Sequence, residues 1–206
     1  MNKKTTGVLP PARRRRLLVT ATREFATAGF EQASLNAIIR ACGMSKSSFY
    51  HYYASKQALF DSVIAEASKA LVDDLDPPDP DDLAGPDFWS HIEALFLRLL
   101  ALSAQQPWYI DLGKLFYLAD ASAAHGTAMR RSLDSATVWL DAALDAGRRS
   151  GAIRTDLPAS LQGALAFAVL QAMDRWSLHH AQKLDATEQQ HLVTQQLDLL
   201  RRMLAP

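Results

Sequence analysis

From Ile38 to Phe60 the chain reads "IIRACGMSKSSFYHYYASKQALF", in which a glycine separates two short segments of helical composition. Gly43 permits the left-handed backbone of a tight turn, which a side chain would resist. Ser45 is placed to cap the helix that follows, which we expect from Lys46 to about Tyr52. Two short helices joined by such a turn form a helix-turn-helix.

The helix after the turn is polar on one side and carries Phe49 on the other. A helix of this kind fits the major groove of duplex DNA, where its N-terminal side chains reach base edges and phosphates. Hydroxyl groups and tyrosines suit phosphate oxygens, which take half or more of the hydrogen bonds in such interfaces. The sequence therefore predicts a DNA-reading surface made of Lys46, Ser47, Ser48, Tyr50 and His51.

The charge distribution agrees with this prediction, although the net charge of the 206-residue chain is zero. Residues 1–60 contain ten Lys or Arg and two acids, whereas residues 61–206 contain twelve bases and twenty acids. Such asymmetry is typical of a basic module that faces nucleic acid, joined to a part that does not bind polyanions.

Three further helices are expected around the turn. The first runs from Pro11 to about Ala28 and is stopped by Gly29. Ser34 can cap the second helix, which ends near Cys42, and Ser55 can cap the fourth. Four consecutive arginines, Arg13–Arg16, open the first helix; they point around its whole circumference, so we expect one or two of them to reach phosphate.

Four short motifs carry a resemblance to a known family. They are "AGF" at Ala28–Phe30, "ACGMS" at Ala41–Ser45, "FYHYY" at Phe49–Tyr53 and "SKQAL" at Ser55–Leu59. In order and spacing, over about residues 11–72, they resemble the DNA-binding segment of the tetracycline-repressor (TetR) family of bacterial transcription regulators. The remainder of the chain resembles the family in architecture only.

The resemblance implies which residues contact DNA: Ser34, Arg40, Ser45, Lys46, Ser47, Ser48, Tyr50, His51 and Lys56. Lys56 would direct its ammonium group at the DNA backbone from the start of the fourth helix, and Ser34 would act similarly from the second. Tyr53 stands where the family has phenylalanine, so we expect it to pack inside. Cys42 stands where the family has alanine, and we expect it to be inert.

The whole chain is expected to be all-α, with about nine helices. Residues 1–10 form a flexible arm, residues 11–72 the DNA-binding domain, residues 73–86 an acidic, proline-rich loop without a core, and residues 87–206 a helical region for ligand binding and dimerisation. The helices predicted in that last region are 87–104, 107–121, 127–149, 158–182 and 187–204.

One DNA-binding module buries too little surface to be selective, so two of them should read a palindromic operator as a dimer. The last two helices are the expected dimer interface, forming a four-helix bundle across a two-fold axis. By resemblance, the C-terminal region would also enclose a small, largely apolar molecule that releases DNA. The candidate lining residues are Trp108, Phe116, Tyr117, Trp139, Phe167, Gln171 and Trp176.

Other classes of function lack the motifs that they require. The sequence contains no glycine-rich phosphate loop, paired-cysteine metal motif or nucleophile elbow, so we expect neither an enzyme nor a cofactor. His179 and His180 are adjacent and point about 100° apart on a helix, so no metal site is expected. The expected setting is the cytoplasm, without a membrane span. The alternative is a constitutive or activating DNA-binding protein that has no small-molecule effector.

Overall fold

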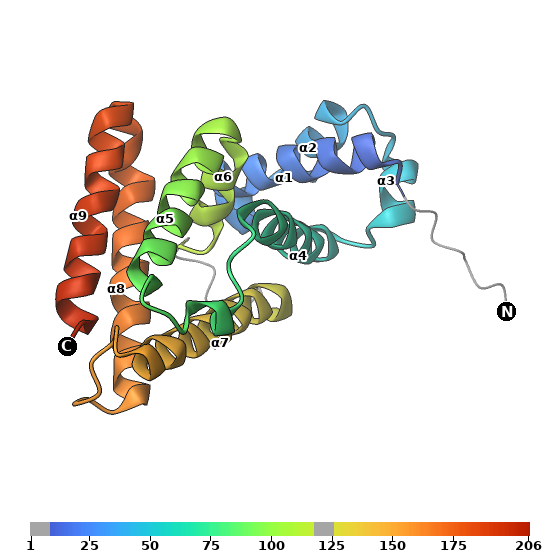
Figure 1. Cartoon of the computed structure of the whole chain (residues 1–206). Helices are drawn as coiled ribbons and strands as arrows, with labels where there is room; N and C mark the ends of the chain where they lie inside the picture. Colours follow the sequence, from blue (N-terminus) through green and yellow to red (C-terminus); the bar gives the residue numbers. More distant parts are fainter. Residues whose placement is uncertain (1–8, 118–125) are drawn as a thin grey trace, which may run out of the picture. The chain divides into compact units, whose positions relative to one another are not determined.

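The computed structural model describes residues 9–117 and 126–206, and each regular element in these ranges is a helix (Figure 1). The α-helices are α1 (Pro11–Gln32), α2 (Leu35–Ala41), α3 (Lys46–Tyr52), α4 (Lys56–Leu75), α5 (Phe88–Gln105), α6 (Trp108–Leu115), α7 (Gly126–Ser150), α8 (Ala159–His180) and α9 (Ala186–Leu204). The predicted all-α fold is confirmed. Most of the predicted arm, residues 1–8, lies outside the described residues.

Two helix ends differ from the sequence prediction. Gly29 interrupts α1 as expected, with φ 72° and ψ 166°, but one further turn continues to Gln32. Helix α6 ends at Leu115, before the predicted end at residue 121, and residues 118–121 lie outside the described ranges. The helices predicted at 87–104, 127–149, 158–182 and 187–204 agree with the structure to within about two residues at each end, which is the usual uncertainty of helix boundaries.

Contacts between residues divide the chain into two compact units. We call Met1–Leu71 with Trp108–Ser132 the head, and Val72–Pro107 with Leu133–Pro206 the body. Helix α6 makes extensive contact with α1 and therefore belongs to the head. This division differs from the predicted domains, in which all residues after 86 form one region.

The core of the head contains a cluster of packed aromatic rings. Phe25 on α1 stacks on Phe30 with ring centroids 6.0 Å apart, and it meets the edge of Phe60 on α4 at 5.0 Å. Each such aromatic pair contributes about 0.5–1.5 kcal/mol of stability beyond the contribution from burying its apolar area. Further fully buried side chains come from α1, α2, α3, α4 and α6 and include Leu17, Ile38, Phe49, Ile64, Leu112 and Leu115.

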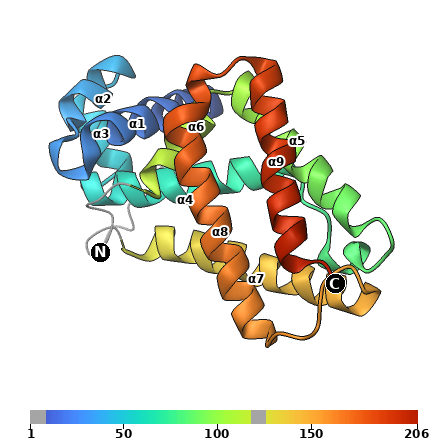
Figure 2. The ribbon, with the colours of Figure 1, turned by 90° about the vertical axis from the view of Figure 1, so that its left-hand side faces the viewer.

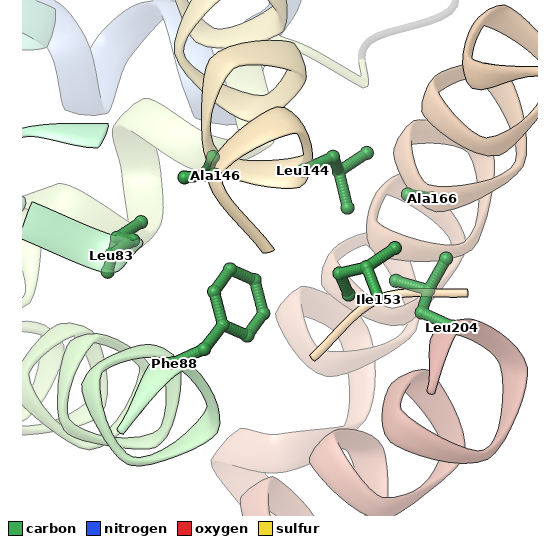
Figure 3. Packing of buried hydrophobic residues seen from close by; sticks show 8 residues of the cluster. Leu83, Phe88, Leu144, Ala146, Ile153, Ala166 and Leu204 are labelled. Carbon is green, nitrogen blue, oxygen red and sulfur yellow. The ribbon is translucent and has the colours of Figure 1, made fainter. Parts of the chain in front are cut away.

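The body has its own hydrophobic core, in which Phe88 and Ile153 pack with residues of α7, α8 and α9 (Figure 3). Gly147 on α7 lies against this core. A Cβ atom at Gly147 would overlap the side chain of Ile153 and approach the ring of Phe88 to 2.9 Å. The absence of a side chain at Gly147 therefore permits close packing between α7 and the start of α5.

The acidic loop predicted at residues 73–86 is partly wrong. Helix α4 continues to Leu75, and a short 3-10 helix forms at Pro80–Leu83, where Asp79 accepts a hydrogen bond from the amide of Asp81 at 3.0 Å. Leu83 is fully buried in the body core. The prolines and aspartates do end the long helix, but the segment returns to the core and buries its leucine there.

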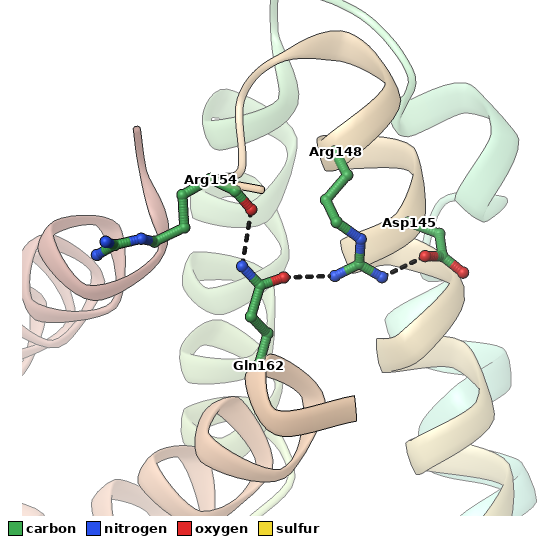
Figure 4. A network of polar contacts seen from close by, with 4 residues as sticks. All are labelled: Asp145, Arg148, Arg154 and Gln162. Carbon is green, nitrogen blue, oxygen red and sulfur yellow. Dashed lines mark hydrogen bonds and ion pairs between the residues drawn. The ribbon is translucent and has the colours of Figure 1, made fainter. Parts of the chain in front are cut away.

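A buried polar network connects α7 to α8 (Figure 4). Gln162 on α8 is 1% exposed; its amide donates to the carbonyl of Arg154 at 2.7 Å and accepts from Arg148 at 2.7 Å. Arg148 also pairs with Asp145. Because both ends of the Gln162 amide are satisfied, its burial carries little desolvation penalty and fixes the connection between the two helices.

Helices α8 and α9 lie side by side in both views of the body, orange and red in Figures 1 and 2. Asp185 and Glu188 form a reciprocal capping box that begins α9. One face of α8 remains exposed and apolar; its members repeat at helical spacing and are Leu161, Leu165, Ala168, Ala172 and Trp176. We call this row the α8 stripe.

Among the described residues, no helix combines the length and apolar character needed to cross a bilayer.

Candidate nucleic-acid interface

The turn between α2 and α3 is built as the sequence predicts. Gly43 has φ 63°, in the left-handed region that favours glycine. The amide of Met44 closes the turn by donating to the carbonyl of Ile39 at 3.0 Å. The side chain of Ser45 accepts from the amide of Ser48 at 3.1 Å, which confirms Ser45 as the cap of α3.

Helix α3 is anchored by Phe49, which is fully buried and packs its ring against Tyr50 and Tyr53 at 5.4 and 5.5 Å. The opposite side of α3 faces solvent, as predicted. Its exposed residues are Lys46, Ser47, Tyr50 and His51, and Ser48 beside them is half-buried. Tyr50 is 53% exposed, which is unusual for a large aromatic residue and leaves its hydroxyl available to a partner.

The structure gives Tyr53 a place inside the head, at the end of a chain of polar contacts. Burial raises the pKa of the Tyr53 phenol, and a hydrogen bond with Ser62 acts against that shift. Ser62 in turn donates to Glu66 at 2.7 Å. Glu66 also accepts from Arg14 at 2.6 Å, and this bond raises the pKa of the guanidinium. The chain joins the first turn of α1 to α4 and to the residue after α3.

The four arginines at the start of α1 do not act alike. Arg14 is paired with Glu66, and Arg16 donates to the carbonyl of Ala41 at the end of α2, at 2.6 Å. These two side chains therefore fasten the helices of the head to one another. All four arginines are exposed, and the contact of one or two of them with phosphate stays a prediction.

Lys56 differs most from its predicted role. Its Nζ donates to the carbonyl of Glu31 at 2.8 Å and to that of Ala33 at 3.4 Å. The ammonium also lies 4.8 Å from the centre of the Phe30 ring, within the range of a cation–π contact. The ammonium group is thus directed at the end of α1, inside the head, where it satisfies carbonyls of the segment that leads to α2.

Ser34 caps α2 as predicted, by accepting from the amide of Ala37 at 3.2 Å. Its own amide donates to Glu24 at 2.8 Å, which fastens the start of α2 to α1. Ser34 is exposed, so its hydroxyl can still donate to a phosphate while it caps the helix. Arg40, further along α2, is also exposed, as its predicted DNA contact requires.

A hollow of about 450 Å³ lies at the junction of α2 and α3. Its lining consists of Asn36, Ile39, Arg40, Met44 and Lys46. Arg40 and Lys46 were predicted to contact DNA, whereas Asn36 and Met44 were not. The signal for Asn36 was present in the sequence: it stands four residues before Arg40, so both lie on one face of α2.

The predicted ligand-lining residues do not all gather in one unit. Trp108, Phe116 and Tyr117 belong to the head, and the other four belong to the body. In the body, the indole N–H of Trp139 donates to the carbonyl of Pro78 at 3.0 Å, while Phe167 and Gln171 are half-buried.

Trp176 is 45% exposed and stacks on His180 with ring centroids 4.6 Å apart. Its side chain therefore faces solvent in the single chain, and the prediction that it lines an enclosed cavity has no support from its burial.

The comparison with known proteins concerns the segment that forms the interface. Residues 17–63, from α1 to α4, match the family described as "Bacterial regulatory proteins, tetR family". This segment is therefore similar to the DNA-binding segment of TetR-family regulators. The family consists of transcriptional regulators and not of enzymes.

The curated relatives match the chain over a short stretch. The uncharacterised HTH-type transcriptional regulator YdgC of Bacillus subtilis is 40% identical over 53 residues, which are 26% of this chain and 27% of YdgC. The match thus spans about a quarter of that relative's length.

Solved structures share the fold over nearly the whole chain. The fatty acid degradation regulator FadR of Bacillus halodurans has a TM-score of 0.70 at 19% identity, covering 94% of this chain and 96% of FadR. FadR of Bacillus subtilis, solved in complex with stearoyl-CoA, has a TM-score of 0.66 at 17% identity, covering 91% and 97%. At these identities the likeness establishes the TetR-family fold alone.

Proposed function

We propose that the chain is a transcriptional regulator that binds a double-stranded DNA operator by inserting α3 into the major groove. The observation that carries this proposal is the construction of α3. It is capped by Ser45, anchored by the buried Phe49 and polar on its exposed face. A short helix held in this way presents its N-terminal residues to base edges without needing to rearrange.

The exposed side chains divide naturally between two tasks. Lys46, Ser47 and Ser48 form the first turn of α3: Ser47 and Ser48 would read base edges, and Lys46 would hold a phosphate at the edge of the groove. Tyr50, His51 and Arg40 would contact phosphates on either side, where hydroxyl and cationic groups find acceptors. Lys56 takes no part in this assignment, because its ammonium group is held by Glu31 and Ala33.

We propose further that two copies associate through α8 and α9. Leu161, Leu165 and Trp176 of the α8 stripe are 45%, 40% and 45% exposed, and Leu199 on α9 is 56% exposed. A continuous apolar row of this kind is more typical of an interface than of a solvated face. Packing the α8 stripe on its two-fold copy would bury these residues in a four-helix bundle.

Dimerisation gives the operator its expected form. Two heads held at one helical turn of DNA, about 34–36 Å apart, would read two half-sites of a palindrome. In the cytoplasm, occupation of such an operator would repress the adjacent gene by blocking access to the DNA.

A small, largely apolar effector that releases the operator is part of the same proposal. Half-buried aromatic side chains in both units and the stearoyl-CoA bound by FadR of Bacillus subtilis support it. Release requires that the effector prefer the arrangement that does not bind DNA, by a coupling of about 1–3 kcal/mol. The alternative is a constitutive or activating DNA-binding protein; the contact of Trp139 with Pro78 and the exposure of Trp176 favour it.

Selection of bound duplexes from a random pool tests the proposal directly. The expected result is an enriched palindrome whose half-sites are centred one helical turn apart, bound by a dimer in sedimentation. Absence of any enriched duplex would refute the DNA-binding role, and enrichment of a single half-site by a monomer would refute the dimer. A screen for apolar compounds that release the selected duplex then separates the regulator with an effector from the constitutive alternative.

A further inference from the structure

The hollow at the junction of α2 and α3 combines an apolar floor with a polar rim. Ile39 is 4% exposed and Met44 is half-buried, so their side chains form the floor. Asn36, Arg40 and Lys46 are exposed and stand around it. A volume of about 450 Å³ is large enough to admit part of a base pair. The reading of DNA proposed above makes use of two rim cations but of neither the floor nor Asn36.

The chemistry of the lining points to one kind of occupant. The 5-methyl group of thymine is the apolar group that a base pair presents in the major groove, and it suits an apolar floor. The amide of Asn36 offers a donor and an acceptor in one plane, which matches N7 and N6–H₂ of adenine. A phosphate offers acceptors only and would pair with the amide N–H₂ of Asn36 but not with its oxygen, so an adenine edge uses the amide more fully.

We propose that this hollow is a specificity site for one A·T base pair in each half of the operator. The thymine methyl group lies on Met44 and Ile39, and the amide of Asn36 pairs with the adenine. Arg40 and Lys46 hold the phosphates that border the pair. The inference rests on the proposed binding of DNA through α3 and adds two residues, Asn36 and Met44, to the set that determines which sequence is bound.

The test uses the full chain and the duplex obtained by selection, with affinity measured by fluorescence anisotropy. Each thymine is replaced in turn by deoxyuridine, which removes only the methyl group. We expect one position in each half-site at which this change weakens wild-type binding about fourfold, because burial of one methyl-sized group contributes about 0.8 kcal/mol. Met44→Ala should bind the thymine and deoxyuridine duplexes equally at that position.

Asn36→Ala provides a second readout on an exposed residue whose loss leaves the core intact. Replacing the A·T pair by G·C should weaken wild-type binding at least fivefold, as expected for a lost bidentate contact, and should affect Asn36→Ala far less. Asn36→Ala with unchanged discrimination between A·T and G·C would remove Asn36 from the specificity site.

The outcomes separate this inference from the proposed function. If the wild-type protein binds no duplex, the DNA-binding role itself fails. If it binds a selected operator but tolerates deoxyuridine at every position, the hollow receives no thymine methyl group and this inference alone is overturned. Discrimination that survives Met44→Ala would also overturn it.

Discussion

Replacement of Lys56 by methionine tests the distinction between a residue that touches DNA and one that supports the head. The ammonium group of Lys56 donates to the carbonyls of Glu31 and Ala33 and lies on the Phe30 ring. Lys56→Met keeps a long apolar side chain and removes the charge and all three donors. The variant therefore isolates the polar contacts from the packing of the side-chain stem.

The expected loss of stability follows from those contacts. A hydrogen bond to a charged group contributes about 1.5–3 kcal/mol and a cation–π contact about 0.5–1 kcal/mol. Because Lys56 is only half-buried and water can reach the exposed Glu31, the total should lie near the lower end, at about 2 kcal/mol. With a urea dependence of roughly 2 kcal/mol per molar, the unfolding midpoint should fall by about 1 M.

DNA binding should respond differently. The ammonium group of Lys56 is held by main-chain carbonyls of the head, so the salt dependence of the Lys56→Met affinity should equal that of the wild type. Lys46→Met is the matched control: Lys46 is exposed at the start of α3, so its loss should leave the urea midpoint unchanged. It should lower the slope of log affinity against log salt by about 0.9, the value for one phosphate contact. A Lys56→Met variant of normal stability whose slope falls by about one unit would refute the assignment.

Three further changes test other parts of the structure. Leu165→Glu in the α8 stripe should give a monomer in sedimentation and abolish binding to the palindrome. Val138→Glu is the control: it changes an apolar side chain on α7 that is 70% exposed, and this variant should remain dimeric. If both variants are dimeric, the proposed interface is contradicted. Gly147→Ala should lower the free energy of unfolding, measured by urea titration, by about 1–3 kcal/mol, because the added Cβ would collide with Ile153 and Phe88. Gly85→Ala, which has open space around its Cβ, should change the free energy of unfolding little. Equal effects of the two substitutions would refute the close approach at Gly147. Because burial raises the pKa of Tyr53, the stability that the neutral phenol contributes is complete below pH 10 and is lost as the pH rises through the folded-state pKa. Tyr53→Phe should therefore lose less stability than the wild type between neutral pH and pH 11. Identical losses would contradict the buried phenol.

Local features of the head were predictable from the sequence. Caps at Ser34, Ser45 and Ser55 depend on hydrogen bonds to amides three residues away, and all three are present. The left-handed turn at Gly43 is equally local. The α3 bounds follow from these signals, which explains why the prediction of Lys46–Tyr52 is confirmed.

Features that depend on distant parts of the chain were not predictable in the same way. The partners of Lys56 are main-chain carbonyls more than twenty residues earlier, which carry no sequence signal. The burial of Leu83 depends on Phe88, α7 and α9. Helical spacing identifies the apolar face of α8 but does not say which aromatic side chains converge, so it could not foresee that Trp176 is 45% exposed in the single chain.

The contacts of Arg16, Glu24 and Lys56 have a consequence for how DNA binding can be controlled. Arg16 and Glu24 fasten α1 to the two ends of α2, and Lys56 fastens α4 to the segment that leads from α1 to α2. Helix α3 is consequently presented by a preassembled block, and docking on the operator costs little conformational entropy. A signal that weakens binding without melting this block must change the block's orientation as a single rigid body, because bending it from within would break several of these contacts at once.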